Sequence, residues 1–154
     1  HLSDLHFHPV ALYEAIKHYA NPFDFIAQST VFAKLAAGYQ EDMQCANSLR
    51  PLADDDKCAA YVLPDEVWAR RVMGIFANKL ANESPQRAHA VITLNHSGDY
   101  TVSVRAALTN PQGADSLCLQ FDTGGGRKAA AGINHLPVDA LDDFVATFKQ
   151  HFCN

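Results

Sequence analysis

Two β-rich runs in the middle of the chain, residues 88–94 and 100–106, constrain the fold most. They are joined by Asn95-His96-Ser97-Gly98-Asp99, a glycine-containing loop of hairpin length. Strands joined by so short a connection run antiparallel. A sheet that holds this hairpin and also a strand reached through a helix is therefore mixed.

The rest of the chain after residue 57 supplies the other elements of such a sheet. In order, the pattern predicts a strand over residues 58–63, a helix over 66–82, the hairpin over 88–106 and a short helix over 115–121. A glycine-rich loop over 124–131, a strand over 132–136 and a final helix that Pro137 begins follow. The helix over 66–82 is expected to turn five apolar side chains inward: Val67, Val72, Ile75, Phe76 and Leu80. We predict an α/β fold, a small mixed sheet with helices over one face.

The first 45 residues have a different character, because apolar residues recur there at helical spacing. We expect one helix over residues 10–19 and a second over residues 23–38, capped by Gly38. Residues 47–57 are polar, and Pro51 and the triplet Asp54-Asp55-Asp56 are typical of a linker. We therefore divide the chain into a helical segment, residues 1–46, and an α/β domain, residues 58–154.

Composition excludes several classes of protein. No apolar run approaches the ~18 residues of a membrane span, and a formal net charge of −5 gives no general basic surface for duplex DNA. The four cysteines are scattered without a C-x-x-C pair, so we expect neither a zinc site nor a disulfide framework, but reduced cysteines in a cytoplasmic protein. Because the chain opens on His1 with no signal sequence, we expect a fragment of a longer protein.

The run Gly124-Gly125-Gly126-Arg127-Lys128-Ala129-Ala130-Ala131-Gly132 is the strongest chemical feature. Consecutive glycines let a ligand approach the main chain closely. Two cations follow, and the three alanines suit a helical turn whose N-terminal amides favour a phosphate. We therefore expect an anion-binding loop, against the alternative of a flexible turn with two solvated basic residues. The spacing matches neither a P-loop nor a dinucleotide fingerprint.

With the upstream strand Tyr100-Thr101-Val102-Ser103-Val104-Arg105, this run resembles the DHHA1 domain, and the resemblance covers about residues 58–152. DHHA1 follows the DHH catalytic domain in phosphoesterases that include exonucleases, oligoribonucleases, cyclic-dinucleotide phosphodiesterases and pyrophosphatases. The resemblance implies that the glycine motif contacts a phosphoester or nucleotide substrate while the DHH domain holds manganese. It assigns phosphate binding to Gly124, Gly125, Gly126, Arg127, Lys128, Arg105 and Ser103.

Two details of the motif refine this hypothesis. DHHA1 phosphoesterases usually have histidine after the three glycines, whereas Arg127 makes the motif GGGR, as in the related domain of alanyl-tRNA synthetases. Arginine grips phosphate through a bidentate fork but offers no imidazole for proton transfer. Ser103 and Arg105 share one face of a strand at period two, so Val102 and Val104 are expected to face the core. The alternative for Arg105 is a solvated arginine on an edge strand.

The catalytic half of a DHH protein is absent from this sequence, which holds no Asp-His-His triplet. The resemblance therefore implies a substrate-binding fragment, inactive alone, that carries no cofactor of its own. The expected parent is a manganese-dependent hydrolase, and the expected partners are a phosphorylated small molecule or short oligonucleotide, the chain's own DHH domain and, in a homodimer, a second copy. No catalytic residue and no metal ligand is assigned to this chain.

Two other functions compete with this one. Arg127 to Gly132 loosely fits the pyrophosphate loop of a GNAT-type acetyltransferase, which binds acetyl-CoA, although Ala130 replaces a loop glycine. Arg105, Arg127 and Lys128 also suit a non-catalytic nucleic-acid-binding module, which the acidic total charge opposes.

Other candidate ligands have plainer interpretations. Asp4, His6 and His8 have metal-binding residue types but are expected to form a polar lead-in to the first helix. Trp68 is assigned to packing rather than to base stacking.

Overall fold

The predicted hairpin is the centre of the observed sheet. The structure is a computed structural model that describes residues 1–153. β3 (Ala88–Leu94) and β4 (Tyr100–Arg105) pair antiparallel from His89↔Arg105 to Leu94↔Tyr100. Asn95 closes the turn, because its side-chain oxygen accepts hydrogen bonds from the amides of Ser97 and Asp99 at 2.8 and 3.2 Å.

Six strands form one sheet in the order β1-β2-β3-β4-β6-β5. The other strands are β1 (Ala53–Asp54), β2 (Cys58–Val62), β5 (Gly124–Arg127) and β6 (Ala130–Leu136). β2 and β3 are parallel because α4 (Val67–Glu83) connects them, and every other neighbouring pair is antiparallel. The predicted fold class, α/β with a mixed sheet, is confirmed.

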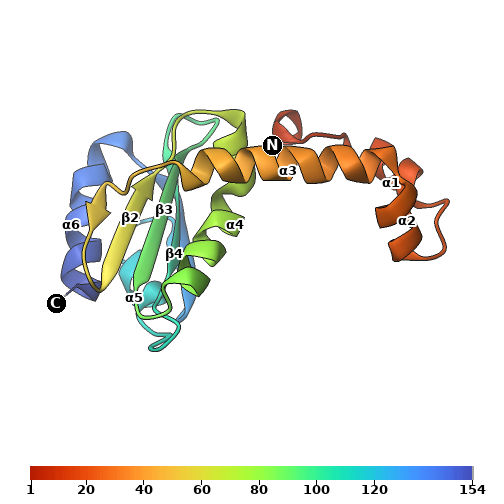
Figure 1. The fold of residues 1–154 in the computed structure, drawn as a ribbon. Helices are drawn as coiled ribbons and strands as arrows, with labels where there is room; N and C mark the ends of the chain where they lie inside the picture. The colour runs from red at the N-terminus through yellow and green to blue at the C-terminus, as the bar shows by residue number, and fades with distance from the viewer. Residues whose placement is uncertain (154) are drawn as a thin grey trace.

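Helices cover both faces of the sheet, not one face as expected (Figure 1). On one face, α5 (Ala114–Cys118), the 3-10 turn η2 (Val138–Ala140) and α6 (Leu141–Phe152) lie over a core that includes Phe144 and Phe148. On the other face, α4 packs over β3 and β4. The prediction was wrong because the strands are apolar on both sides: Ile92 enters the first core and Val91 the second.

The predicted helix 66–82 matches α4, but two of its five expected core residues lie at the surface. Val72 and Phe76 are buried, and Leu80 packs partly buried against them. Ile75 and Val67, in contrast, are 45% and 39% exposed. The apolar stripe is broader than the surface that the sheet presents, so its margin stays in solvent.

The N-terminal segment is helical, as expected, but its helices have other limits. It holds η1 (Leu2–Asp4), α1 (Pro9–Ile16), α2 (Pro22–Gln28) and α3 (Thr30–Asn47). The predicted helix 23–38 is broken at Ser29, whose hydroxyl accepts hydrogen bonds from the amides of Val31 and Phe32 and so begins α3. Gly38 does not cap a helix but lies inside α3, where a side chain would collide with the ring of His6.

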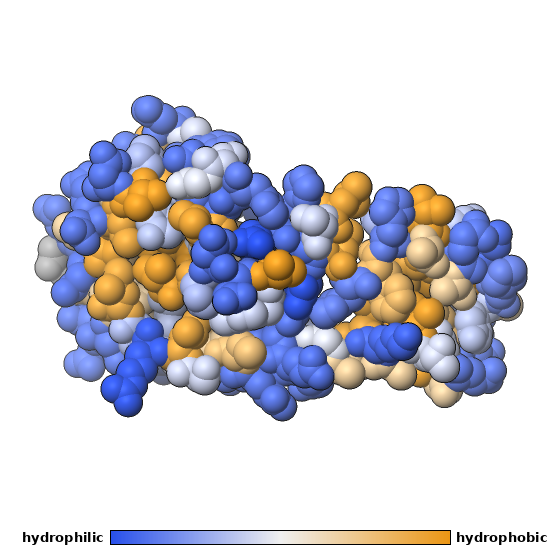
Figure 2. Space-filling view, turned by 90° about the horizontal axis from the view of Figure 1, so that it is seen from above, coloured by the Kyte–Doolittle hydropathy of each residue, from blue (hydrophilic) through white to orange (hydrophobic). Residues whose placement is uncertain are grey.

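Figure 1 shows α1 and α2 at the end of α3 that lies away from the sheet. Large apolar side chains remain exposed there, including Val10, Tyr13 and Phe23, and Figure 2 shows hydrophobic surface over this helical segment. No residue of α1 is buried. Within residues 1–153, no helix is long and apolar enough to cross a membrane.

Ion pairs to two buried carboxylates join the N-terminal segment to α4 and the hairpin loop. Asp4 accepts hydrogen bonds from His96 at 2.8 Å and from Arg70 at 3.2 Å. These contacts, with that of His96 the strongest, lower the pKa of Asp4 to about 2. Asp42 of α3 binds Arg71 of α4 through two bonds of 2.7 Å. Burial alone would raise the pKa of Asp42, but the hydrogen bonds and charges of Arg71 and His6 together outweigh it, so the pKa lies below its usual value.

The expectation of four reduced cysteines is wrong for two of them. Cys58 of β2 and Cys153, next to the end of α6, form a disulfide across a Cα–Cα distance of 5.7 Å. A separation of 95 positions in the sequence hid the pairing, because only the completed fold brings the end of α6 beside β2. Cys45 and Cys118 are free.

Candidate functional site

Two arginines lie in one row across the outer half of the sheet. The register pairs Arg105 of β4 with Ala130 of β6, and Ala130 with Arg127 of β5. Directly paired residues of neighbouring strands project to the same face. Arg105 and Arg127 therefore both belong to the α4 face, at the end of the sheet that α4 leaves open.

A second row, without bulky side chains, lies beside the first. It runs from Ser103 of β4 through Gly132 of β6 to Gly125 of β5. A side chain placed on Gly125 would meet no atom within 4 Å, so this floor is open to solvent. A cavity of about 370 Å³ lies on this surface, which we call the shelf; it is lined by Arg105, Gly125, Gly126, Arg127, Ala130, Ala131 and Gly132.

Neutral groups hold the guanidinium of Arg105 in place. Its Nε donates to Oδ1 of Asn78 at 2.8 Å, and its Nη1 donates to the Ser103 hydroxyl at 2.9 Å. The same Nη1 also donates to the Val104 carbonyl at 3.1 Å. These bonds fix the orientation of the side chain without neutralising its charge.

The positive charge of the shelf is not compensated by an acid. No ion pair to Arg105 or Arg127 forms within residues 1–153. Burial lowers the pKa of Arg105, and the nearby charge of Arg127 lowers it further. Two guanidinium groups beside an exposed glycine backbone can bind an anion through charge-assisted hydrogen bonds.

The glycine run is not the loop and helical turn that the sequence suggested. Residues Gly124–Arg127 form the edge strand β5, Lys128 and Ala129 make a tight turn, and Ala130 begins β6. The alanines therefore offer no free helical amides to a phosphate. The reason is pairing with β6, since Gly124 through Arg127 match Ile133 through Ala130 in continuous register.

Two of the three glycines have structural reasons that involve no ligand. A side chain on Gly124 would lie 1.7 Å from the carbonyl oxygen of Cys118 in α5. Gly126 has a φ of 147° and lies against Ala131. Gly125 has no such contact, because a side chain there would meet no atom within 4 Å.

The other residues assigned to the site lie at different places. Ser103 is buried and contacts Arg105, and Val102 and Val104 enter the opposite core, so the predicted alternation is confirmed. Lys128, although next to Arg127, lines a separate cavity on the α5 and α6 side of the sheet. The shelf thus brings together Arg105, Gly125, Gly126 and Arg127, and not Gly124 or Lys128.

The N-terminal polar residues form hydrogen bonds and ion pairs within the fold. Asp4 and His6 join the ion pairs to α4 and α3, and His8 caps α1 through the amide of Val10. Among residues 1–153, no three His, Cys, Asp or Glu side chains gather to hold a metal ion. Trp68 packs against the core under α4, as expected.

One residue of the site has no signal in the sequence. Asn78 projects from α4 and accepts the Nε hydrogen bond of Arg105 across 27 residues. An exposed asparagine on a helix is ordinary, and only the packing of α4 along β4 gives this one a role.

Comparisons with known proteins support the fold. No protein-family model matches the chain, and no curated protein matches it. Among solved structures, the pGpG-specific phosphodiesterase PggH from Vibrio cholerae is similar over 92% of this chain, with a TM-score of 0.55 and 13% identity. An exopolyphosphatase-related protein from Bacteroides fragilis aligns over 74% of this chain and 34% of its own, with a TM-score of 0.47 and 16% identity. The chain spans about half the length of the PggH structure, 48%, and shares the fold of that part.

Proposed function

We propose that this chain is the substrate-binding part of a DHH-type phosphoesterase, and that the shelf holds a phosphate of a phosphorylated small molecule or short oligonucleotide. One observation carries the proposal: Arg105 and Arg127 lie in register on an open glycine floor, and no acid among residues 1–153 pairs with either. The likeness of the fold to a pGpG-specific phosphodiesterase supports it, as does the resemblance of the GGGR run to the DHHA1 motif.

The two arginines have different parts in this proposal. Arg105 is oriented in advance by Asn78 and Ser103, so little side-chain freedom is lost when a phosphate binds. Arg127 is exposed on the edge strand and closes on the ligand from the side. Because neither arginine gives up a proton at neutral pH, the shelf binds and orients the phosphate but moves no proton.

Hydrolysis requires the rest of the parent protein. The proposal places manganese in the DHH domain and assigns no metal to the chain described here. The substrate then lies between the shelf and that domain, which is the chain's first partner; a second copy is the other partner we propose. Purified chain in manganese should not hydrolyse pGpG, and turnover in proportion to its concentration would contradict the assignment of roles.

Site-resolved titration tests the shelf. We expect pGpG to shift the NMR amide signals of Gly125, Gly126 and Arg127. Charge-assisted hydrogen bonds contribute about 1.5–3 kcal/mol each. Arg105→Ala and Arg127→Ala should therefore each lower the pGpG affinity obtained from these amide shifts by about tenfold or more.

Lys128→Ala is the matched control, because it removes a cation next in sequence to Arg127 that does not line the shelf. It should change the affinity read at Gly125 less than about twofold. Equal losses in the Arg127 and Lys128 variants would show general charge attraction instead of a built site.

The acetyltransferase alternative loses its structural basis. A pyrophosphate loop of that type needs a strand that leads into a helix, whereas Arg127 to Gly132 forms a turn between two antiparallel strands. The nucleic-acid module remains an outcome of the titration. Binding that does not change with oligonucleotide length and falls steeply with salt would favour it.

A further inference from the structure

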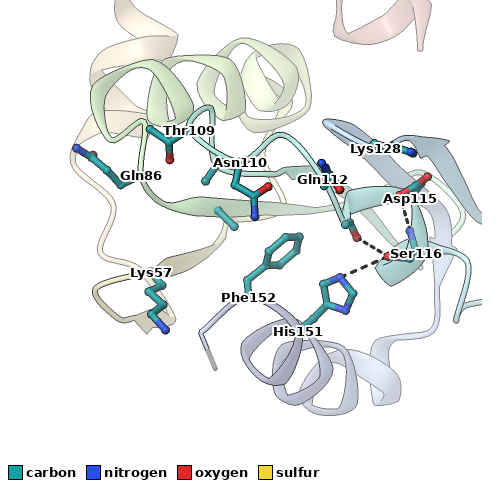
Figure 3. A pocket seen from close by; sticks show the side chains of 13 residues that line it. Lys57, Gln86, Thr109, Asn110, Gln112, Asp115, Ser116, Lys128, His151 and Phe152 are labelled. Carbon is teal, nitrogen blue, oxygen red and sulfur yellow. Dashed lines mark hydrogen bonds between the residues drawn. The ribbon is translucent and has the colours of Figure 1, made fainter.

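A second cavity lies on the other side of the sheet from the shelf. Its volume is about 670 Å³, within the usual range for small-molecule sites. The residues after β4, the beginning of α5, the end of α6 and the residue before β2 surround it. Figure 3 shows Lys128 and Asp115 at one end of this cavity and Lys57 at the other.

Several polar side chains reach this cavity without a partner in the protein. Lys57, Asn110, Gln112 and Lys128 form no side-chain hydrogen bond or ion pair with any other residue in the part of the chain described, residues 1–153. Each carboxamide offers both a donor and an acceptor. Polar groups that converge on one concave surface and leave their capacity unused are characteristic of a ligand site.

An aromatic ring forms the apolar wall. Phe152 is half-buried, and its ring contacts Phe148 at a centroid distance of 5.4 Å and His151 at 4.8 Å. Figure 3 shows the Phe152 ring between Asn110 and His151, within the cavity. A flat aromatic group of a ligand can stack on such a ring while its polar edge meets the carboxamides.

The charges distinguish among possible ligands. Lys57 and Lys128 attract an anion, but Asp115 also lines the cavity and repels a ligand that is only anionic. Asp115 accepts best from amino or hydroxyl groups, which a base and a ribose both carry. An aromatic wall, carboxamides, two lysines and one carboxylate together match a nucleotide better than inorganic phosphate or a polyphosphate.

We propose that this cavity is a second, separate binding site for a mononucleotide. The base stacks on Phe152 with its edge toward Asn110 and Gln112, and Lys128, at one end of the cavity, holds the phosphate. This site goes beyond the proposed phosphoesterase role and does not depend on it, because the cavity and the shelf have no lining residue in common: Arg127 lines the shelf, and its neighbour Lys128 lines the cavity.

GMP and AMP titrations of the 154-residue chain, followed by NMR at the amides of Asn110, Gln112 and Gly113, test the proposal. We expect saturable shifts there, an affinity about tenfold lower in Asn110→Ala and in Lys128→Ala, and an unchanged affinity in Arg127→Ala. Phe152→Leu should weaken binding about tenfold through lost stacking. A thermal melt of each variant shows that it is folded.

The opposite results overturn the proposal. Ribose 5-phosphate that binds as tightly as GMP would show an anion site without base recognition. Nucleotide shifts that Arg127→Ala abolishes would place the nucleotide on the shelf, and no shift at millimolar GMP would show that the cavity binds none. If pGpG does not bind at Gly125 while GMP still binds at Asn110, the proposed function of the shelf is contradicted and the proposal for this cavity stands.

Discussion

The two faces of the sheet are built from the same strands but in opposite ways. Under α5 and α6 the core is apolar and closed, with Phe144 and Phe148 stacked at 6.1 Å and the Cys58–Cys153 disulfide fastening the end of α6. On the α4 face, strand residues under or beside the helix include the polar His89 and Ser103, and the sheet beyond them is open.

Single strands make this difference by alternation. In β4, Val102 and Val104 enter the closed core while Ser103 and Arg105 face the other way. The glycine strand alternates as well, since Gly124 packs against α5 and Gly125 floors the shelf. The apolar core under α5 and α6 thus stabilises the fold, while the proposed phosphate contacts of the shelf lie on the other face, so a substitution can change stability or shelf binding with little effect on the other.

The largest test of this separation removes the disulfide. Cys58→Ala with Cys153→Ala releases a loop of 95 residues, which should cost about 4 kcal/mol of unfolding free energy through the restored freedom of the unfolded chain. Urea denaturation measures it, and the pGpG affinity of the folded protein should not change. Cys45→Ala, at a free and exposed position, is the control. An unchanged midpoint would show that the closed face does not need the link.

Neighbouring glycines give a sharper test of the same division. Gly124→Ala puts a methyl group against the Cys118 carbonyl oxygen and should cost about 3 kcal/mol through overpacking. Gly125→Ala meets no atom within 4 Å, so its stability should stay within about 0.5 kcal/mol, while the added methyl weakens pGpG binding on the shelf. Equal destabilisation of both variants in thermal melts would show that both faces of β5 are packed equally tightly, which contradicts this division.

Local patterns predicted much of this architecture. The hairpin, the strand at residue 58, the long helix before the hairpin and the shared face of Ser103 and Arg105 all follow from spacing within a few residues. The sequence also pointed to the glycine run, of which Gly125, Gly126 and Arg127 line the shelf.

Long-range contacts decided the rest. The glycine run forms a strand because β6 pairs with it. Cys58 forms a disulfide with Cys153 because α6 ends beside β2. Lys128 separated from Arg127 because a turn between antiparallel strands sends adjacent side chains to opposite faces. Each outcome depends on residues far apart in the chain, which periodicity alone does not report.

The smallest expected effect concerns His89, a polar residue buried under the α4 face. It is 1% exposed, and its Nδ1 has no hydrogen-bond partner among the described residues. Burial, with a further contribution from the charge of Arg87, lowers the pKa of His89 from 6.5 to about 4. Between pH 6.5 and about 4, His89 is protonated in the unfolded chain but neutral in the folded chain, so the free energy of unfolding decreases as the pH falls.

From pH 7 to pH 5 this linkage should remove about 2 kcal/mol of unfolding free energy. His89→Leu removes the titrating group and should flatten the dependence of stability on pH between pH 7 and pH 5. The linkage of Asp4, whose pKa is lowered to about 2, acts at lower pH and does not interfere. Urea denaturation of both proteins at pH 7, 6 and 5 measures the difference. Parallel curves for the two proteins would show that His89 accepts its proton in the fold, and that the α4 face is as open to water at β3 as it is at the shelf.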